Sequence, residues 1–198
     1  MVGRKQYDED EAVHAAMLAF WQSGYEGTSI SMLEEATGLS KSSIYNAYGS
    51  KEQLYARALD RFSSHYGKSL IDDLNHPEFI GAVRQFFSRL LRRFENDYEP
   101  MGCFATKAGL EIGSTDVPAA EIVCAGLHRL QEAFRDRAER AVKDGHLPES
   151  ADCDRITAVL VSHTRGIAVL NLGTGSTSMA REAVEGLVQL LGAMNSSR

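Results

Sequence analysis

Apolar residues recur along this 198-residue chain with the spacing of helices, and no segment shows the alternation of a β-strand. In the first predicted helix the apolar stripe consists of Val13, Ala16, Met17, Phe20 and Trp21. Asp8 and Glu11 have the spacing of a capping box at its start, and Gly24 ends it. Similar patterns continue to the end of the chain. The sequence therefore predicts an all-α protein with about nine helices.

Two short helices joined by a glycine turn follow the first helix. Thr28 or Ser29 begins the first of them, Gly38 breaks it, and Ser40 can cap the second, which Gly49 ends. These proportions are those of a helix-turn-helix motif, whose second helix reads base edges in the major groove of DNA. The alternative is a plain helical hairpin with a solvated second helix.

Four more regions carry a helical pattern. A capping box at 50–53 opens a helix that runs to about residue 62, and a longer helix follows His76 and Pro77. A short helix covers about 103–112, and Pro118 can stand in the first turn of a long helix that ends near Lys143. The last two helices, at about 154–172 and 178–194, are rich in small and aliphatic residues.

Charge and cysteine usage exclude several classes of protein. The chain has 21 basic and 27 acidic residues, a formal net charge of −6, which argues against a polybasic nucleic-acid coat protein and against a cationic membrane-surface helix. Its three cysteines are widely spaced, and neither a CxxC nor an HExxH motif is present, so no metal site and no cofactor is expected. Without a secretory signal or a stretch of about 20 apolar residues, the sequence predicts a cytoplasmic, reduced protein that does not enter a membrane.

Two runs of sequence resemble the TetR family of transcriptional regulators. The run AFWQSGYEGTSI at 19–30 is similar to that family's first helix and entry turn. The run TGLSKSSIYNAYGSKEQL at 37–54 is similar to its turn, recognition helix and the start of its fourth helix. The resemblance implies a helix-turn-helix DNA-binding domain at 1–62, a helical effector-binding and dimerisation domain at 63–198, and a homodimer.

The resemblance also implies which residues contact DNA. Positions facing bases match Lys41, Ser42, Ser43 and Asn46, whereas positions facing phosphate match Thr28, Tyr45 and Lys51. The full set of predicted DNA-binding residues is Thr28, Ser29, Lys41, Ser42, Ser43, Tyr45, Asn46 and Lys51. Tyr48 is expected to pack inside the motif. Glu34 departs from the family pattern, in which a small residue is common, and bears on how closely the first two helices of the motif approach.

The effector site is less well marked. Gly102, Cys103 and the residues after them resemble a GC-led sixth helix found in one TetR subgroup, which implies no particular effector. Apolar and polar residues that could line a cavity for an unknown small molecule are Phe86, Phe87, Leu90, Cys103, Phe104, Glu111, Leu127, His128 and His163. The alternative is that the aromatic residues are core and that Cys103 is a structural cysteine, since only Lys107 stands near enough in sequence to activate its thiol.

The last two helices have the composition of an interface between two protomers. Their aliphatic residues are Ile156, Val159, Leu160, Ile167, Val169, Leu170, Val184, Leu187, Val188, Leu190, Leu191 and Met194. Packing within one protomer could use the same residues. The family resemblance favours a homodimer through these helices, whose symmetry implies a palindromic operator in double-stranded DNA. A ligand-responsive repressor is the predicted function.

The sequence argues against two other classes of function, an enzyme and a protein-binding adaptor. The glycine-rich stretch at 173–176 lacks the lysine and the preceding strand of a phosphate-binding loop, so it indicates a connection between helices and not an enzyme. Asp72 and Asp73 are adjacent carboxylates without a catalytic partner and are expected to be solvated. A helical adaptor that binds protein is disfavoured by the Lys, Ser, Tyr and Asn side chains of the second motif helix.

The N-terminal part is not basic as a whole. Residues 1–68 hold seven basic and nine acidic residues, a net charge of −2. With Lys41, Lys51 and Arg4 or Lys5 from each protomer, a dimer would neutralise roughly six to eight phosphates. The expected log–log slope of affinity against salt is about −5 to −7.

Overall fold

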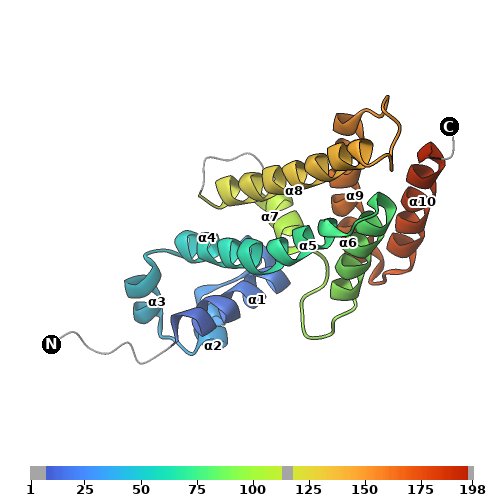
Figure 1. The fold of residues 1–198 in the computed structure, drawn as a ribbon. Coiled ribbons are helices and arrows are strands. Elements are labelled where there is room, and N and C mark those ends of the chain that lie inside the picture. The colour runs from blue at the N-terminus through green and yellow to red at the C-terminus, as the bar shows by residue number, and fades with distance from the viewer. Residues whose placement is uncertain (1–7, 113–117, 196–198) are drawn as a thin grey trace. The chain divides into compact units, whose positions relative to one another are not determined.

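The structure, a computed structural model, describes residues 8–112 and 118–195, and this part of the chain is helical without strands (Figure 1). Its α-helices are α1 (Glu9–Gly27), α2 (Ile30–Thr37), α3 (Lys41–Tyr48), α4 (Lys51–Phe62), α5 (Lys68–Asp72), α6 (Phe79–Phe94), α7 (Phe104–Ile112), α8 (Pro118–Lys143), α9 (Cys153–Thr174) and α10 (Ser178–Asn195). A π-helical turn, Ser63–Gly67, makes α4 and α5 one continuous stretch. The all-α architecture is therefore confirmed.

The predicted helix starts are confirmed by their hydrogen bonds. The Asp8 carboxylate accepts from the amides of Asp10 and Glu11 at 2.9 and 3.4 Å. The Ser40 hydroxyl accepts from the amide of the third residue of α3 at 3.2 Å, and Ser50 does the same for α4 at 3.1 Å. Each side chain satisfies a backbone donor that the helix itself cannot pair. Short polar residues ahead of the apolar stripes thus set where these helices begin.

The chain divides into two compact units. The first, called unit 1, contains residues 1–65 and 103–124, and the second, unit 2, contains residues 66–102 and 125–198. In unit 1, α1 packs along α4, α2 packs on α1, and α7 packs on both α1 and α4. A short helix from the middle of the chain therefore belongs with the N-terminal helices.

Aromatic side chains form the centre of unit 1. Trp21 of α1 lies 5.1 Å from Phe62 of α4, and Tyr55 of α4 lies 5.6 Å from Phe104 of α7, measured between ring centroids. All four side chains are buried, and both pairs meet edge to face, which is a favourable geometry for aromatic rings. Because Phe104 fills the space between α1 and α4, α7 is anchored to the helices that carry the motif.

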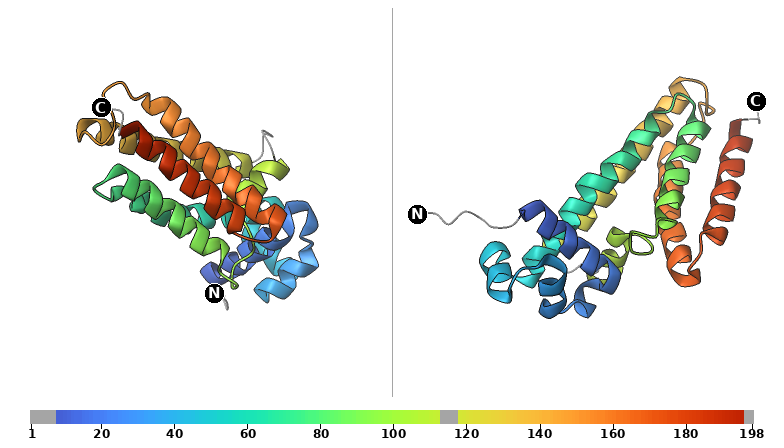
Figure 2. Two further views of the ribbon diagram at one scale, coloured as in Figure 1. Left: turned by 90° about the vertical axis from the view of Figure 1, so that its right-hand side faces the viewer. Right: turned by 90° about the horizontal axis from the view of Figure 1, so that it is seen from below.

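Unit 2 is built around α6, α9 and α10, which lie side by side (Figure 2). Phe86 and Phe87 of α6 meet Phe134 of α8 in its interior, with the Phe86 and Phe134 ring centroids 4.9 Å apart. Leu160 of α9 and Val184 of α10 belong to the same buried cluster. Burial of these faces supplies most of the stability of such a helical unit.

An ion pair of a buried carboxylate with a partly exposed arginine corrects one expectation about unit 2. Asp72 is exposed as predicted, but Asp73 is only 4% exposed. Its carboxylate accepts two hydrogen bonds from Arg89, one of them at 2.8 Å, and a third from Gln85 at 3.0 Å. This pairing raises the pKa of the Arg89 guanidinium. The prediction that both carboxylates are solvated is wrong for Asp73, because α6 brings two donors to it from more than ten residues away.

Helix α9 is markedly apolar, although the sequence analysis expects no stretch long and apolar enough to enter a membrane. Among the described residues it is the one helix long and apolar enough to cross a membrane by length and composition. Ile156, Leu160 and Ile167 on α9 are buried in the core of unit 2. The core of a helical protein passes the same test as a membrane span, and packing against α6 and α10 accounts for the apolar character of this face.

Candidate nucleic-acid interface

Helices α2 and α3 form the predicted helix-turn-helix. Gly38 ends α2 in the left-handed region at φ +69°, a conformation that favours glycine, and its amide donates to the Glu34 carbonyl at 2.9 Å. Leu33 of α2 and Ile44 of α3 are fully buried. Tyr48 is 4% exposed, which confirms that it packs inside unit 1. These apolar contacts hold α3 with one side towards the protein and the other towards solvent.

The exposed side of α3 carries polar groups of the kind that contact DNA. Lys41, Ser42, Tyr45 and Asn46 are exposed, and Tyr45 retains 40% of its surface. The four positions have i, i+1, i+4 and i+5 spacing, so they share one face of the helix. An ammonium, a hydroxyl, a phenol and an amide on an eight-residue helix can donate to base edges and to phosphate oxygens.

Three of the predicted contact residues use their hydroxyl groups in hydrogen bonds within the chain. Thr28 is fully buried, and its hydroxyl donates to the Gly24 carbonyl at 2.6 Å. The Ser29 hydroxyl accepts from the Met32 amide at 3.2 Å and so caps α2. Ser43 is partly buried, and its hydroxyl lies 2.9 Å from that of Ser40. These residues shape the motif in the structure, and their contact with DNA stays a prediction.

Lys51 is the first residue of α4 and follows the N-cap Ser50. It therefore lies at the positive end of the helix dipole. Its ammonium nitrogen lies 4.4 Å from the centroid of the Tyr25 ring, a cation–π distance. Burial, followed by the nearby Glu52 and Glu26 carboxylates, raises the pKa of the Tyr25 hydroxyl. Lys51 is thus held beside a helix N-terminus, an arrangement that suits a phosphate.

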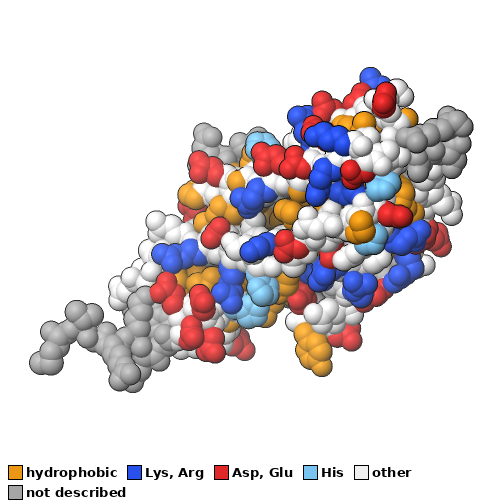
Figure 3. Space-filling view, viewed as in Figure 1, with side chains coloured by type: hydrophobic (Ala, Val, Ile, Leu, Met, Phe, Trp, Pro, Cys, Tyr) orange, Lys and Arg blue, Asp and Glu red, His pale blue; other side chains and the backbone are white. Residues whose placement is uncertain are grey.

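Charges of both signs mix on the surface around these helices. On the face shown in Figure 3, Lys and Arg side chains are interspersed with Asp and Glu, and no uniform basic field is seen there. The first turn of α3 contains no acidic residue. On this face, positive charge is thus not concentrated over a wide area, in line with the net charge of −2 at residues 1–68.

Glu34 is a site residue whose role the sequence analysis did not find. Its carboxylate oxygen Oε1 accepts from the backbone amide of Lys41 at 2.6 Å. The side chain thereby joins α2 to the first residue of α3, and the two helices approach closely enough for this contact. An acid one turn before the end of α2, ahead of a helix start that lacks acids, is the signal that could have predicted it.

Two side chains of α7 hold the end of α1. The Lys107 ammonium donates to the Trp21 carbonyl at 2.8 Å, and the Glu111 carboxylate accepts from the Tyr25 amide at 2.8 Å. Between them Gly24 breaks the helix at φ +76°, and a Cβ there would lie 1.8 Å from a Glu111 oxygen. Desolvation by burial lowers the pKa of Lys107, opposed by Glu111. Gly24 is therefore favoured for its φ, and a side chain there would displace the Glu111 carboxylate from its present position.

This arrangement bears on three effector candidates. Glu111 is engaged with the main chain of α1, and Phe104 is a fully buried core residue of unit 1. Cys103 is partly buried and is not in a disulfide. The ammonium group of Lys107, four residues after Cys103, donates to the Trp21 carbonyl of α1. The described contacts give Glu111 and Phe104 structural roles in unit 1, and a sensor role for Cys103 stays a prediction.

The other effector candidates lie in unit 2. Phe86, Phe87 and Leu90 are buried in its core. For the two phenylalanines this agrees with the alternative that the aromatic residues are core residues. His163 of α9 is brought against Phe87, with ring centroids 5.3 Å apart. On α8, Leu127 is partly buried and His128 is exposed. Within unit 2 the fold thus brings together Phe86, Phe87 and His163.

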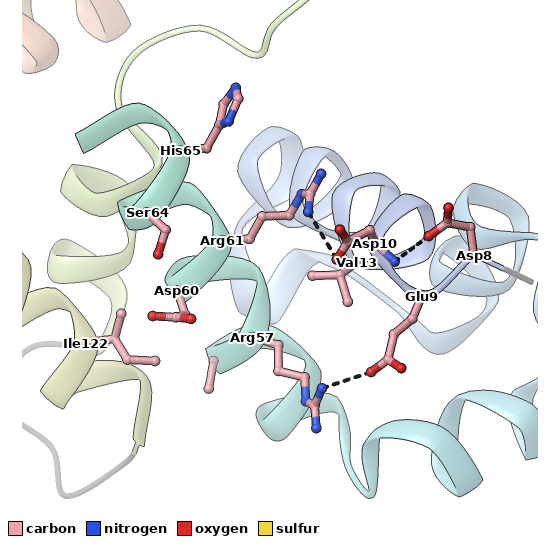
Figure 4. A pocket seen from close by; sticks show the side chains of 11 residues that line it. Asp8, Glu9, Asp10, Val13, Arg57, Asp60, Arg61, Ser64, His65 and Ile122 are labelled. Carbon is pink, nitrogen blue, oxygen red and sulfur yellow. Dashed lines mark hydrogen bonds and ion pairs between the residues drawn. The ribbon is translucent and has the colours of Figure 1, made fainter. Parts of the chain in front are cut away.

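A concave feature of unit 1 lies between the start of α1 and α4 (Figure 4). This open cleft of about 760 Å³ is lined by charged side chains. Glu9 pairs with Arg57 at 3.0 Å, and Asp10 pairs with Arg61 at 3.5 Å. The pairs fasten the first turn of α1 to α4. Among the described residues no group of three or more His, Cys, Asp or Glu side chains could hold a metal ion.

Two family models match the chain. The model described as bacterial regulatory proteins, tetR family, matches residues 12–58, which include α2 and α3. The model described as tetracyclin repressor-like, C-terminal domain, matches residues 80–187. The two matches cover the motif and most of unit 2.

Two curated relatives are transcriptional repressors by name. The chain is 35% identical over 104 residues to the HTH-type transcriptional repressor ComR of Escherichia coli (strain K12), a match that spans 50% of this chain and 49% of ComR. It is 24% identical over 150 residues to the HTH-type transcriptional repressor BdcR of the same organism, which is 75% of this chain and 72% of BdcR. The chain thus spans about half the length of the first of these relatives.

Solved structures show the same fold. A TetR transcriptional regulator from Chloroflexus aurantiacus J-10-FL has a TM-score of 0.83 at 24% identity, and the match covers 92% of both chains. A cysteine mutant of the TetR family transcriptional regulator CifR, complexed with 26bp double-strand operator DNA, has a TM-score of 0.76 at 27% identity, with 98% of both chains covered.

Proposed function

This chain belongs to the TetR family of bacterial regulatory proteins, and on that premise we propose that it is a sequence-specific DNA-binding repressor. In this proposal it acts in the cytoplasm, binds a palindromic operator as a homodimer, and leaves the operator when a small molecule binds. The observation that carries the proposal is the exposed polar face of α3, held outwards by the buried Ile44 and Tyr48.

The family consists of transcriptional regulators, so the chain is not an enzyme. The glycine-rich stretch at 173–176 has a structural explanation. Gly175 is the C-cap of α9 in the left-handed region at φ +65°, and its amide donates to the Asn171 carbonyl at 3.0 Å. A glycine at this position ends the helix without strain. The stretch is thus a helix terminus and not a phosphate loop.

Contacts between α3 and DNA are proposed for Lys41, Ser42, Tyr45 and Asn46. Lys51 would add a phosphate contact at the start of α4. The CifR complex with operator DNA supports DNA binding by this chain, because CifR matches nearly the whole length of the chain at 27% identity, and the individual contacts are proposed from the exposure of these side chains. Thr28 and Ser29 would contribute through the start of α2, where Ser29 is the cap.

The DNA-binding proposal is tested by gel shift with the duplex that the wild-type protein selects from a random library. The change Tyr45→Ala is expected to weaken binding roughly ten- to hundredfold, because each protomer of a dimer loses a contact to a charged phosphate. Tyr98→Ala is the matched control, since Tyr98 is 92% exposed in unit 2, and its affinity should equal that of wild type. Failure of the wild-type protein to enrich any sequence would refute the proposal.

Dimerisation is proposed through α9 and α10. Their buried residues, such as Leu160 and Val188, pack within unit 2, whereas Val159, Val169, Met179 and Leu190 are exposed, Leu190 by 72%. The structure therefore divides the aliphatic residues of these helices into an inner and an outer set. An outer set of large apolar side chains on two adjacent helices fits a second copy of the chain.

Release by a small molecule rests on the family and on the C-terminal model that matches residues 80–187. Phe86, Phe87, Leu90, Leu127, His128 and His163 remain the candidates in unit 2, and Cys103, Phe104 and Glu111 those in unit 1. A ligand at Phe86 or Phe87 would have to displace core packing, because both side chains are buried. Electrophiles and apolar compounds are the classes to screen. A response that survives Cys103→Ser would exclude Cys103 as a thiol sensor.

A further inference from the structure

The turn between α2 and α3 is closed by the side chain and main chain of one residue, Glu34. Its carbonyl accepts from the Gly38 amide at 2.9 Å, at the end of α2. Its carboxylate accepts from the Lys41 amide at 2.6 Å, at the start of α3. A change in the direction of α3 relative to α2 would break the second bond while leaving the first intact. The Glu34 side chain therefore restrains the angle between α2 and α3.

The carboxylate also supplies a charge that α3 lacks. The first turn of α3 contains no acidic residue, although negative charge near a helix N-terminus is favourable. Ser40 caps α3 by accepting from the Ser43 amide at 3.2 Å, and this bond leaves the Lys41 amide for another acceptor. The Glu34 carboxylate of α2 is that acceptor. The start of α3 is thus neutralised from α2.

A helix N-terminus with open amides is a ready site for phosphate. At α3 one amide is engaged by a carboxylate, and the negative charge beside it repels the DNA backbone. Glu34 is partly exposed, so this charge acts on whatever approaches the start of α3. Sequence-independent affinity for DNA comes almost entirely from phosphate contacts. A carboxylate at this point weakens such binding without touching the base-facing side chains.

We infer that Glu34 is a positioning and specificity-determining residue of the DNA-binding motif. Its acceptor oxygen holds the start of α3 in the direction that operator recognition needs, and its charge lowers affinity for non-operator DNA. The inference rests on the proposed function. It goes beyond that function by assigning specificity to a residue of α2 that reads no base.

Three variants separate the two parts of the inference. Glu34→Gln keeps an acceptor oxygen and removes the charge, whereas Glu34→Ala removes both. Glu35→Gln is the matched control, because Glu35 is the exposed next residue of α2 and undergoes the same loss of charge. Affinity is measured for the duplex selected by wild type and for a random-sequence duplex of the same length, at one salt concentration.

In Glu34→Gln, affinity for the random duplex is expected to rise about three- to tenfold, since two carboxylates per dimer are lost. Affinity for the selected duplex, which also depends on base contacts, is expected to rise by a smaller factor. In Glu34→Ala, affinity for the selected duplex is expected to fall tenfold or more, because both protomers lose a cap-like bond. Glu35→Gln should raise random-duplex binding by less than twofold. An equal rise in both Gln variants, or an unchanged selected complex in the Ala variant, would overturn the inference.

Hydrogen exchange at the Lys41 amide tests the contact without DNA. Exchange should be faster in Glu34→Ala and unchanged in Glu34→Gln and Glu35→Gln, with thermal unfolding used to establish that each variant is folded. Equal exchange in all variants would overturn the positioning role even if the wild-type protein selects no DNA. A wild-type protein that selects no DNA would instead refute the proposed function.

Discussion

At the scale of single residues, His163 links the stability of unit 2 to pH. Its ring lies edge to face against the Phe87 ring, with centroids 5.3 Å apart, and the side chain is partly buried. Burial lowers the pKa of His163 below its usual value near 6.5, although a hydrogen bond to the backbone of Ala183 opposes the shift. The folded protein therefore prefers the neutral ring.

The sign of the pH effect follows from this lowered pKa. Below about pH 6.5 the unfolded chain binds a proton that the folded chain does not, so stability is lost as the pH falls towards the folded pKa. Between pH 7.5 and 5.5 the Tm is expected to fall by about 2–4 °C more in wild type than in His163→Leu. Thermal unfolding measures this, with His65→Leu, at an exposed position, as the control that keeps the wild-type response. An identical pH response in His163→Leu would rule out this role.

Other residues show how far sequence reasoning reached. Ser40, Ser50 and Gly38 act within a few positions of themselves, and their roles as caps were predicted. Glu111 was a candidate for the effector site, and the sequence did not indicate that it accepts a hydrogen bond from the Tyr25 amide, 86 positions earlier in the chain. A local pattern carries no information about a partner that only packing brings near.

At the scale of elements, α9 and α10 each present two apolar faces. The inner face packs in unit 2, and the outer face includes Val169 and Leu190. Gly166 and Gly186 would meet nothing within 4 Å if they carried a Cβ, so packing within the protomer does not require these glycines. Small residues on an outer face allow a second chain to approach closely. The glycines are therefore an independent argument for a partner helix.

The proposed dimer is tested by Leu190→Glu. A buried carboxylate in a protein–protein interface is costly, so the variant is expected to be monomeric at concentrations where wild type is a dimer. Its affinity for a palindromic duplex should fall more than tenfold, since the two half-sites are no longer bound together. Sedimentation or light scattering measures the mass. Leu110→Glu is the control, because Leu110 is 73% exposed on α7 in unit 1 and its change should leave the mass unaltered.

At the scale of the whole molecule, a net charge of −6 accompanies a proposed DNA-binding function. In unit 1 two arginines of α4 are paired with carboxylates at the start of α1, Arg57 with Glu9 and Arg61 with Asp10. These pairs remove arginines from the charge available to DNA. The cations left for phosphate are Lys41 and Lys51, together with Arg4 or Lys5, which lie outside the described residues.

This count predicts how binding depends on salt. Six to eight phosphate contacts per dimer give a log–log slope of about −5 to −7 for the selected duplex. Lys51→Gln should make the slope less steep by about two, because each protomer loses one contact. Binding isotherms across a salt series measure both values. A wild-type slope much steeper than −7 would mean that further cations contact the backbone.

The sequence by itself determined the helices, their caps, the helix-turn-helix and the family. These properties depend on periodicity and on contacts within about one helical turn, which a single chain displays directly. The tertiary structure alone decided that Asp73 is buried by Arg89, that α7 holds the end of α1, and which faces of α9 and α10 remain outside. Such contacts depend on the angles and registers at which helices pack, and these are set by the fit of side chains distant in sequence.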